Sequence, residues 1–247
     1  MLIESREKNN VFWIVINRME KANAINAQMW RSIAQKLDEA SESPNSRIVA
    51  LTGTGRFFSA GEDIMDLSGA TTFTAAFDLF IGTLRPVFDK VLRCPKPVVA
   101  AVNGQAVGAG TEIVFACDLA VASPEASFSL AQGKRGIGPA LALTLGMPVL
   151  GRKRLSEAAM TGRKFSAEEA EEWGIVNSVA RNGLDVEVER LAKEVSQTPP
   201  ALTRMMKEVM LTQMSMLEYE SAFHHIAMYS QSQETRQGIG KFVSKRS

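Results

Sequence analysis

The five residues Val98–Val102 constrain the fold of this chain more than any other segment. All five are apolar, and Lys96-Pro97 leads into them. A strand of uninterrupted apolar residues is buried on both faces, which is typical of a parallel sheet with helices on each side. The turn that follows, residues 103–110, is rich in glycine, and the chain then continues as a predicted helix from Thr111. We therefore expect an α/β fold.

Predicted strands and helices alternate through the first half of the chain. An alternating segment from Leu2 and a second strand over residues 11–16 flank an Asn-Asn turn, which predicts a hairpin. Asn26 is in position to cap a helix over residues 27–40, and residues 48–52 form a short apolar strand. Helical periodicity runs through residues 73–92, with a kink or break expected at Pro86.

From Pro148 the predicted structure is mostly helical. Thr-Gly, Trp-Gly, Asn-Gly and Pro-Pro pairs separate the helical segments. These segments lie near residues 153–160, 167–172, 184–196, 200–214 and 216–229. Since no internal repeat or low-complexity linker is visible, we predict one α/β core with an appended helical region.

Composition excludes several classes of protein. The 247 residues are 45% hydrophobic and 22% charged, with a net charge of +1, so a large core is available and a nucleic-acid or anionic membrane partner is not indicated. Cys94 and Cys117 have no metal-ligand spacing and lie in apolar stretches, which predicts free thiols in a reducing compartment. The polar N-terminus and the lack of a bilayer-length apolar run predict a soluble, cytoplasmic protein.

Two segments share the pattern of a strand, a glycine-containing turn and a helix start. They are residues 57–64, FFSAGEDI, and residues 103–112, NGQAVGAGTE. Such turns leave main-chain N–H groups unpaired at a helix start, with the positive end of the helix dipole behind them. Two of these groups that converge on one oxygen form an oxyanion hole, and small residues there allow a thioester close to the backbone.

Other catalytic motifs are absent from the sequence. The glycines at 104, 108 and 110 are spaced GxxxGxG, not GxGxxG, and no GxxxxGK[ST] occurs. Ser59 lies in FSAG, and the two histidines, His224 and His225, are adjacent on a late predicted helix. A Ser-His-Asp site and a metal site are therefore not indicated.

The residues resemble the enoyl-CoA hydratase/isomerase (crotonase) family over essentially the whole chain. Each motif is moderately specific, and it is their order and spacing that make the match strong. The motifs are FFSAGEDI at 57–64, KPV at 96–98 with Asn103-Gly104, GAGTE at 108–112 with Cys117-Asp118-Leu119, the Leu-Gly pairs near 145 and 150, residues 155–162, residues 170–176 and the tail 234–242.

The resemblance implies the family's fold and assembly. Residues 1–195 are expected to form a crotonase-like spiral core of ββα units, and residues 196–247 a C-terminal helical oligomerisation region. Homotrimers, often paired into hexamers, are the usual assembly of such proteins.

The resemblance also implies the catalytic residues. By position, the oxyanion N–H groups are those of Ala60 and Ala109, where the family usually has glycine at the second. Glu112 matches the first family glutamate, a general acid/base. The second family glutamate is Gln132 here, which cannot transfer a proton but can position water or substrate by hydrogen bonds. A further acidic position used by some relatives is Ala140.

Other residues are assigned to coenzyme A or held as lesser candidates. Glu62 and Asp63 are nearby acids that offer weaker substitutes for the second carboxylate. Coenzyme A is expected to lie along the segment after the first glycine turn and an early turn, closed over by the last helix. The residues implied are Lys21, Ala22, Ser59, Gly61, Asp63, Ile64, Phe242 and Lys245.

The expected function is hydration of a 2-enoyl-CoA thioester through a stabilised enolate, as in fatty acid metabolism. Coenzyme A is then part of the substrate, and no separate cofactor is needed. Isomerisation of an enoyl-CoA with one carboxylate is the alternative within the family, although many family isomerases keep their base at the position of Gln132. An acyl-CoA-binding subunit with little catalysis, and a structural protein that does not bind coenzyme A, are the alternatives from other classes.

Overall fold

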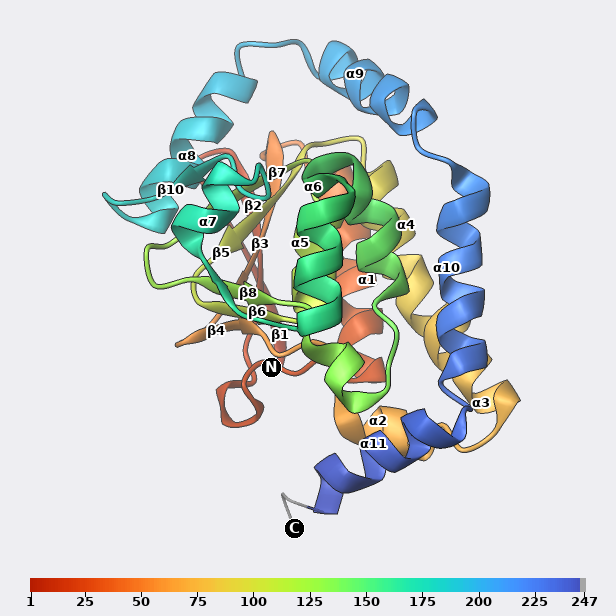
Figure 1. Ribbon diagram of the computed structural model, residues 1–247. Coiled ribbons are helices and arrows are strands. Elements are labelled where there is room, and N and C mark those ends of the chain that lie inside the picture. Colours follow the sequence, from red (N-terminus) through yellow and green to blue (C-terminus); the bar gives the residue numbers. More distant parts are fainter. Residues whose placement is uncertain (245–247) are drawn as a thin grey trace.

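The computed structural model describes residues 1–244, and its strands form two sheets (Figure 1). The larger sheet has six strands, in the spatial order β1 (Ile3–Lys8), β2 (Val11–Ile16), β3 (Ile48–Gly53), β5 (Val98–Val102), β7 (Leu119–Ala122) and β10 (Ser178–Val179). The smaller has four, in the order β4 (Phe57–Ser59), β6 (Gln105–Val107), β8 (Ser127–Ser129) and β9 (Phe165–Ser166). Neighbouring strands are parallel except for β1 with β2 and β8 with β9.

Successive pairs of strands alternate between the two sheets. In the pairs β3–β4, β5–β6 and β7–β8, the first strand joins the larger sheet and the second joins the smaller one. Helical segments follow each pair, so the chain winds forward by one ββα unit at a time. The predicted α/β fold with a spiral of ββα units is therefore confirmed.

The helices cover the sheets and extend beyond them. They are α1 (Ala27–Glu42), α2 (Ile64–Gly69), α3 (Phe73–Phe77), α4 (Arg85–Arg93), α5 (Ala109–Ala116), α6 (Ala140–Thr161), α7 (Ala167–Glu172), α8 (Leu184–Val195), α9 (Pro200–Thr212), α10 (Met216–Tyr229) and α11 (Gln233–Ser244). Two 3₁₀ segments, η1 (Met19–Lys21) and η3 (Ala131–Arg135), and one π-helical segment, η2 (Asp78–Leu84), complete the list.

Strand β5 is buried on both faces, as its sequence predicts. Val98, Ala100 and Val102 pack into the main hydrophobic cluster with α1 and α4. Val99 and Ala101 face the opposite way, into a second cluster with residues of α8. A polar side chain at any of these five positions would be buried away from water, which explains why all five residues are apolar.

Several local predictions hold in detail, and two need correction. Asn9 and Asn10 adopt φ of 51° and 64° in the hairpin turn, and the Asn26 side chain accepts from the Met29 N–H at the start of α1. The break expected at Pro86 within residues 73–92 lies before that residue instead, because a π-helical segment ends at Leu84 and Pro86 lies in the first turn of α4. Helix α6 begins earlier than predicted, at Ala140, and is interrupted at Gly151, whose φ is 64°.

Helices α9–α11 form an arc around the outside of the core (Figure 1). Helix α10 packs on α6 and η2, and α11 packs on α2 and η3. The boundary predicted between residues 195 and 196 falls between α8, which packs on the sheet, and α9. The division into two functional regions stays a prediction.

Helix α9 is tied to the core by a buried lysine. Lys207 is 6% exposed, and its Nζ donates to Asp118 Oδ2 at 2.5 Å and to the Val91 carbonyl at 2.9 Å. We expect Lys207→Met to lower the free energy of unfolding by about 3 kcal/mol, because the Asp118 carboxylate, whose side chain is 19% exposed, would lose its ammonium partner. Urea unfolding followed by circular dichroism measures this change.

A surface pair on the same helix provides the control. Arg204 forms an ion pair with Glu208, and both side chains are more than 60% exposed. Arg204→Met should therefore change the free energy of unfolding by less than about 1 kcal/mol. Adding Asp118→Asn to Lys207→Met should restore part of the loss. Equal effects of the two single substitutions would contradict a structural role for the buried pair.

Three further features bear on the sequence-based expectations. Within residues 1–244, no helix combines the length and apolar character needed to cross a membrane. The same residues contain no group of three or more His, Cys, Asp or Glu side chains placed to hold a metal ion. Cys94 and Cys117 are free thiols, with Cys94 buried and Cys117 partly buried.

Candidate functional site

The two glycine turns lie side by side because their strands are neighbours. Strands β4 and β6 are parallel, so the turns that follow them leave the same edge of the smaller sheet. A Cβ atom at Gly61 would lie 2.6 Å from the Val107 carbonyl oxygen and 2.9 Å from the Ala109 nitrogen. Gly61 also has a φ of 86°, so both the close approach and the backbone conformation require glycine.

The prediction that Ala60 supplies a free N–H group is wrong. The Ala60 N–H donates to the Ala22 carbonyl at 3.0 Å. The Gly61 N–H donates to Ser59 Oγ at 3.0 Å, and the Asp63 N–H donates to the Ile25 carbonyl at 2.9 Å. In this turn, the main-chain amides of residues 60, 61 and 63 are thus already bonded to the protein.

Glu62 is the residue of this turn whose N–H remains available. Neither it nor the N–H of Ala109 has a hydrogen-bond partner among residues 1–244. Ala109 is the first residue of α5, where the helix leaves N–H groups unpaired and presents the positive end of its dipole. The available pair of donors is therefore Glu62 and Ala109, which keeps one predicted residue and replaces the other.

A small inner chamber lies next to these two N–H groups. Its volume is about 50 Å³. Both donor residues line it, together with Glu112 and Gln132. The remaining lining residues are Ala60, Leu67, Phe80, Leu84, Val107, Gly108, Arg135, Ile137, Gly138 and Ile226. The structure thus brings all four predicted catalytic residues, Ala60, Ala109, Glu112 and Gln132, to one cavity, although the N–H group of Ala60 is bonded within the protein.

Glu112 is a buried carboxyl group at the start of α5. It is 4% exposed, and its Oε1 accepts a hydrogen bond from the Ala142 N–H at 3.1 Å. Burial raises the pKa of Glu112 to about 7, while the Ala142 N–H and the Gln132 side chain partly offset the rise. A carboxyl group with this pKa can accept a proton when ionised and donate one when neutral near neutral pH.

Gln132 lies on η3 with its amide against the second glycine turn. A Cβ atom at Gly108 would lie 3.5 Å from Gln132 Oε1, an ordinary contact distance, so the amide lies directly against this turn. This Oε1 is buried and has no hydrogen-bond partner among the described residues. An unpaired buried acceptor of this kind is available to a ligand or a water molecule.

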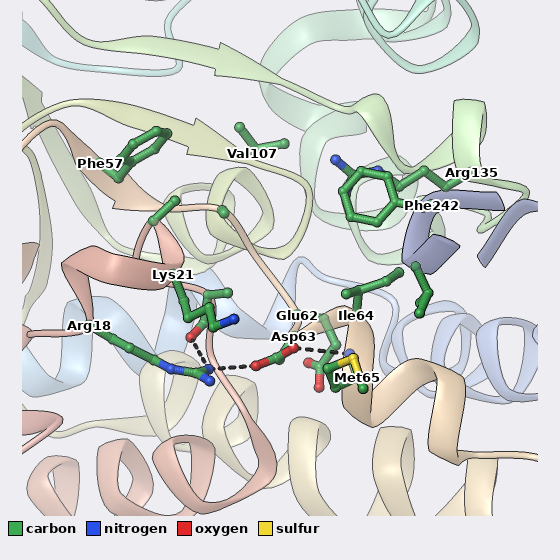
Figure 2. A pocket seen from close by; sticks show the side chains of 14 residues that line it. Arg18, Lys21, Phe57, Glu62, Asp63, Ile64, Met65, Val107, Arg135 and Phe242 are labelled. Carbon is green, nitrogen blue, oxygen red and sulfur yellow. Dashed lines mark hydrogen bonds and ion pairs between the residues drawn. The ribbon is translucent and has the colours of Figure 1, made fainter. Parts of the chain in front are cut away.

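A larger outer cleft opens beside the chamber, with a volume of about 390 Å³ (Figure 2). The two cavities share Ala60, Glu62, Val107 and Arg135 in their walls. The other residues of the outer cleft are Arg18, Lys21, Ala22, Ala24, Phe57, Asp63, Ile64, Met65, Phe242 and Val243. Five of the residues predicted to bind coenzyme A therefore line it: Lys21, Ala22, Asp63, Ile64 and Phe242.

The remaining predicted coenzyme A residues have other positions. Ser59 is fully buried, and its hydroxyl bonds the Asn23 carbonyl and the Gly61 N–H, so its side chain shapes the turn instead of meeting a ligand. Gly61 is buried beneath the turn and does not line either of these two cavities. Lys245 lies outside the described residues.

Asp63 lines the outer cleft, but its carboxylate makes contacts that stabilise the fold. One oxygen pairs with Arg18 at 2.6 Å, and the other caps α2 by accepting from the Met65 N–H (Figure 2). The lesser candidate role of Asp63 in proton transfer is therefore not supported, because both oxygens are occupied by structural contacts.

Sequence reasoning missed two cationic residues of the cavities. Arg18 lines the outer cleft, and Arg135 lines both cavities with its guanidinium 4.1 Å from the centre of the Phe242 ring (Figure 2). This stacking connects η3 to α11 at the boundary between cleft and chamber. An arginine three residues after Gln132 was visible in the sequence, but its position depends on the packing of α11.

Comparison with known proteins supports the family suggested by the motifs. A family model described as Enoyl-CoA hydratase/isomerase matches residues 6–247. The chain is 31% identical to the 1,2-epoxyphenylacetyl-CoA isomerase of Escherichia coli over 255 residues, which cover 99% of this chain and 96% of that protein. It is 33% identical to the carnitinyl-CoA dehydratase of Salmonella arizonae over 238 residues, covering 92% and 89%.

A solved structure agrees with these sequence relationships. A crystal structure of an enoyl-CoA hydratase/isomerase from Mycobacterium paratuberculosis superposes with a TM-score of 0.86 and 27% identity, covering 97% of this chain and 98% of that one. The match includes both the sheets and the C-terminal helices, given its coverage. The fold, the family model and these relatives together establish that the chain belongs to the enoyl-CoA hydratase/isomerase family.

Proposed function

We propose that this acyl-CoA enzyme hydrates a 2-enoyl-CoA thioester through an enolate intermediate. The observation that carries the proposal is the pair of unpaired N–H groups, Glu62 and Ala109, beside a chamber that contains the buried Glu112. A thioester carbonyl oxygen that accepts both hydrogen bonds gains most when it becomes negative in the transition state. Glu112 then accepts a proton from the attacking water.

The outer cleft is proposed to hold coenzyme A as part of the substrate, with no separate cofactor. Lys21 in its wall is a cationic group suited to the phosphates, and Phe242 and Ile64 offer apolar surface to the pantetheine chain. The acyl group then enters the chamber past the shared wall residues Ala60 and Val107.

Isomerisation is a second candidate, and Gln132 favours it. Moving a double bond requires one group that removes and returns a proton, whereas hydration also requires a water held between acid and base groups. Because glutamine cannot transfer a proton, a mechanism with Glu112 alone suits isomerisation of a 3-enoyl-CoA.

The assembly and location are proposed from an exposed apolar surface and from the two cysteines. Helix α9 exposes Leu202, Met205, Met206, Val209 and Met210, an apolar surface suited to a subunit contact in a homotrimer or a hexamer. The free thiols of Cys94 and Cys117 fit the reducing cytoplasm.

Two substrates and one binding measurement test the function. Hydration of crotonyl-CoA lowers the ultraviolet absorbance of the conjugated thioester and adds the mass of water. A 3-enoyl-CoA that becomes conjugated raises the absorbance without a change in mass. Tight binding of acyl-CoA with no turnover of either substrate would support the binding subunit instead, and no binding would contradict every acyl-CoA role.

A further inference from the structure

The side chain of Glu62 is a second buried carboxyl group in the cavity system. Its Oε2 accepts a hydrogen bond from Trp30 Nε1 at 2.6 Å. Trp30 is fully buried on α1, so the indole holds the carboxyl group in one position. The other oxygen, Oε1, is buried and has no hydrogen-bond partner among the described residues.

Glu62 and Glu112 are the carboxyl-bearing residues in the wall of the inner chamber. Most of the surrounding wall is apolar, with Leu67, Phe80, Leu84, Ile137 and Ile226. Both acidic residues line a chamber of about 50 Å³, and the charge of Glu112 acts on the Glu62 carboxyl group. Glu62 also belongs to the wall of the outer cleft, where Figure 2 shows its side chain beside the Arg18–Asp63 pair.

Burial raises the pKa of both carboxyl groups, and the charge of Glu112 opposes ionisation of Glu62. Burial raises the pKa of Glu62 well above its usual value, and the nearby charges of Asp66, Asp63 and Glu112 raise it further, whereas the Trp30 hydrogen bond lowers it. The pKa of Glu112 is about 7. The charge of ionised Glu112 therefore helps to keep the proton on Glu62, as in acid–base pairs whose environments differ.

We propose that Glu62 is a catalytic residue, the proton donor that works opposite Glu112 in place of the acid missing at Gln132. The proposal rests on the proposed function and assigns two tasks to one residue. The main-chain N–H of Glu62 binds the thioester oxygen, and its side chain supplies the proton that the enolate needs.

The proton balance of hydration closes with these two groups. The Glu112 carboxylate accepts a proton from water as the water oxygen bonds to Cβ. The electron pair of the double bond moves to give the enolate, whose oxygen is held by the two N–H groups. Glu62 then gives its proton to Cα, and transfer of the Glu112 proton to Glu62 through bound water restores the starting state.

The test is Glu62→Gln. The amide keeps the size of the side chain, can still accept from Trp30 and leaves the main-chain N–H in place, but it has no proton to transfer. We expect kcat for crotonyl-CoA hydration to fall about 100-fold, within the range found for loss of a general acid. The KM and the dissociation constant of a saturated acyl-CoA should change less than threefold.

A pH profile separates proton donation from a structural effect. The wild-type kcat should fall at alkaline pH as Glu62 loses its proton, and this decline should disappear in Glu62→Gln. The matched control is Glu208→Gln, an exposed acid outside both cavities whose Oε1 accepts from Arg204 Nε at 2.7 Å. An amide can also accept this bond, so kcat should stay within threefold of wild type.

The outcomes distinguish this inference from the proposed function. If Glu112→Gln abolishes turnover and Glu62→Gln retains kcat within threefold of wild type, the inference is wrong and the function stands. If the wild type turns over no enoyl-CoA, the function fails and the role of Glu62 fails with it. A 100-fold loss in Glu62→Gln with an unchanged alkaline limb would also overturn proton donation by this residue.

Discussion

Ala109→Pro is expected to lower kcat for enoyl-CoA turnover by about 10²–10³-fold, the usual loss when one oxyanion donor is removed. Proline lacks the N–H group but is tolerated at the first residue of a helix, which is the position of Ala109 in α5. The preceding Gly108 has φ 58° and ψ −121°, outside the α region that a following proline disfavours. The change therefore acts on the donor more than on the fold.

Ala109→Gly is the matched control for this prediction. It removes the methyl group and keeps the N–H, so kcat should remain within about fivefold of wild type. Steady-state kinetics give kcat, and thermal unfolding of both variants verifies that the fold is intact. A proline variant with near-normal kcat and a normal melting temperature would exclude an oxyanion role for this amide.

The residues that form local structure could be predicted from the sequence alone. Asn9 and Asn10 take up left-handed backbone in the hairpin turn because asparagine tolerates it, and Asn26 caps α1 through its own side chain. The segment Val98–Val102 predicts a strand buried on both faces because each of its residues is apolar. In each case the physical cause lies within a few residues of the position concerned.

The choice between Ala60 and Glu62 could not be made in this way. It depends on residues 22–25, which accept hydrogen bonds from the Ala60 and Asp63 amides and leave the Glu62 amide free. Those hydrogen bonds join segments almost forty residues apart. Every residue type has the same main-chain amide, so the sequence does not indicate which amides form them. The motif predicts where the turn lies, but the hydrogen bonds to distant residues determine which N–H group of the turn remains free.

The buried state of Ser59 and the position of Glu62 have the same origin. Ser59 appears in the motif as a polar residue near a ligand, but its hydroxyl bonds the Asn23 carbonyl beneath the turn. The Glu62 carboxyl group is held by Trp30, which comes from α1, an element distant in sequence. Tertiary packing therefore decides which polar residues of the motif meet the cavities.

Glu112→Gln is expected to lower kcat by about 10³-fold, within the range for loss of a general base. The amide can still accept the hydrogen bond from the Ala142 N–H but cannot accept a proton from water. In the wild type, kcat/KM should rise as the pH increases through about 7, since the base must be ionised and its pKa is about 7. Turnover by Glu112→Gln equal to wild type would contradict the role of this residue.

The same substitution should make the protein more stable at alkaline pH. The pKa of Glu112 is raised in the folded state from 4.5 to about 7, so the folded protein binds its proton more tightly than the unfolded chain. This favourable contribution is complete below pH 4.5 and is lost as the pH rises through 7, a change of about 3 kcal/mol at 1.36 kcal/mol for each pKa unit. Glutamine carries no such dependence.

Urea unfolding of wild type and Glu112→Gln at two pH values isolates this effect. The wild type must ionise a buried carboxyl group at pH 8, whereas the variant has none to ionise. The free energy of unfolding of the wild type minus that of the variant should therefore be about 3 kcal/mol lower at pH 8 than at pH 4.5. A difference between the proteins that is equal at both pH values would mean that Glu112 is not the group that titrates near neutral pH. Ionisation of Glu112 both creates the catalytic base and lowers the free energy of unfolding. If kcat/KM and the free energy of unfolding change with midpoints near the same pH, both effects are assigned to this one carboxyl group.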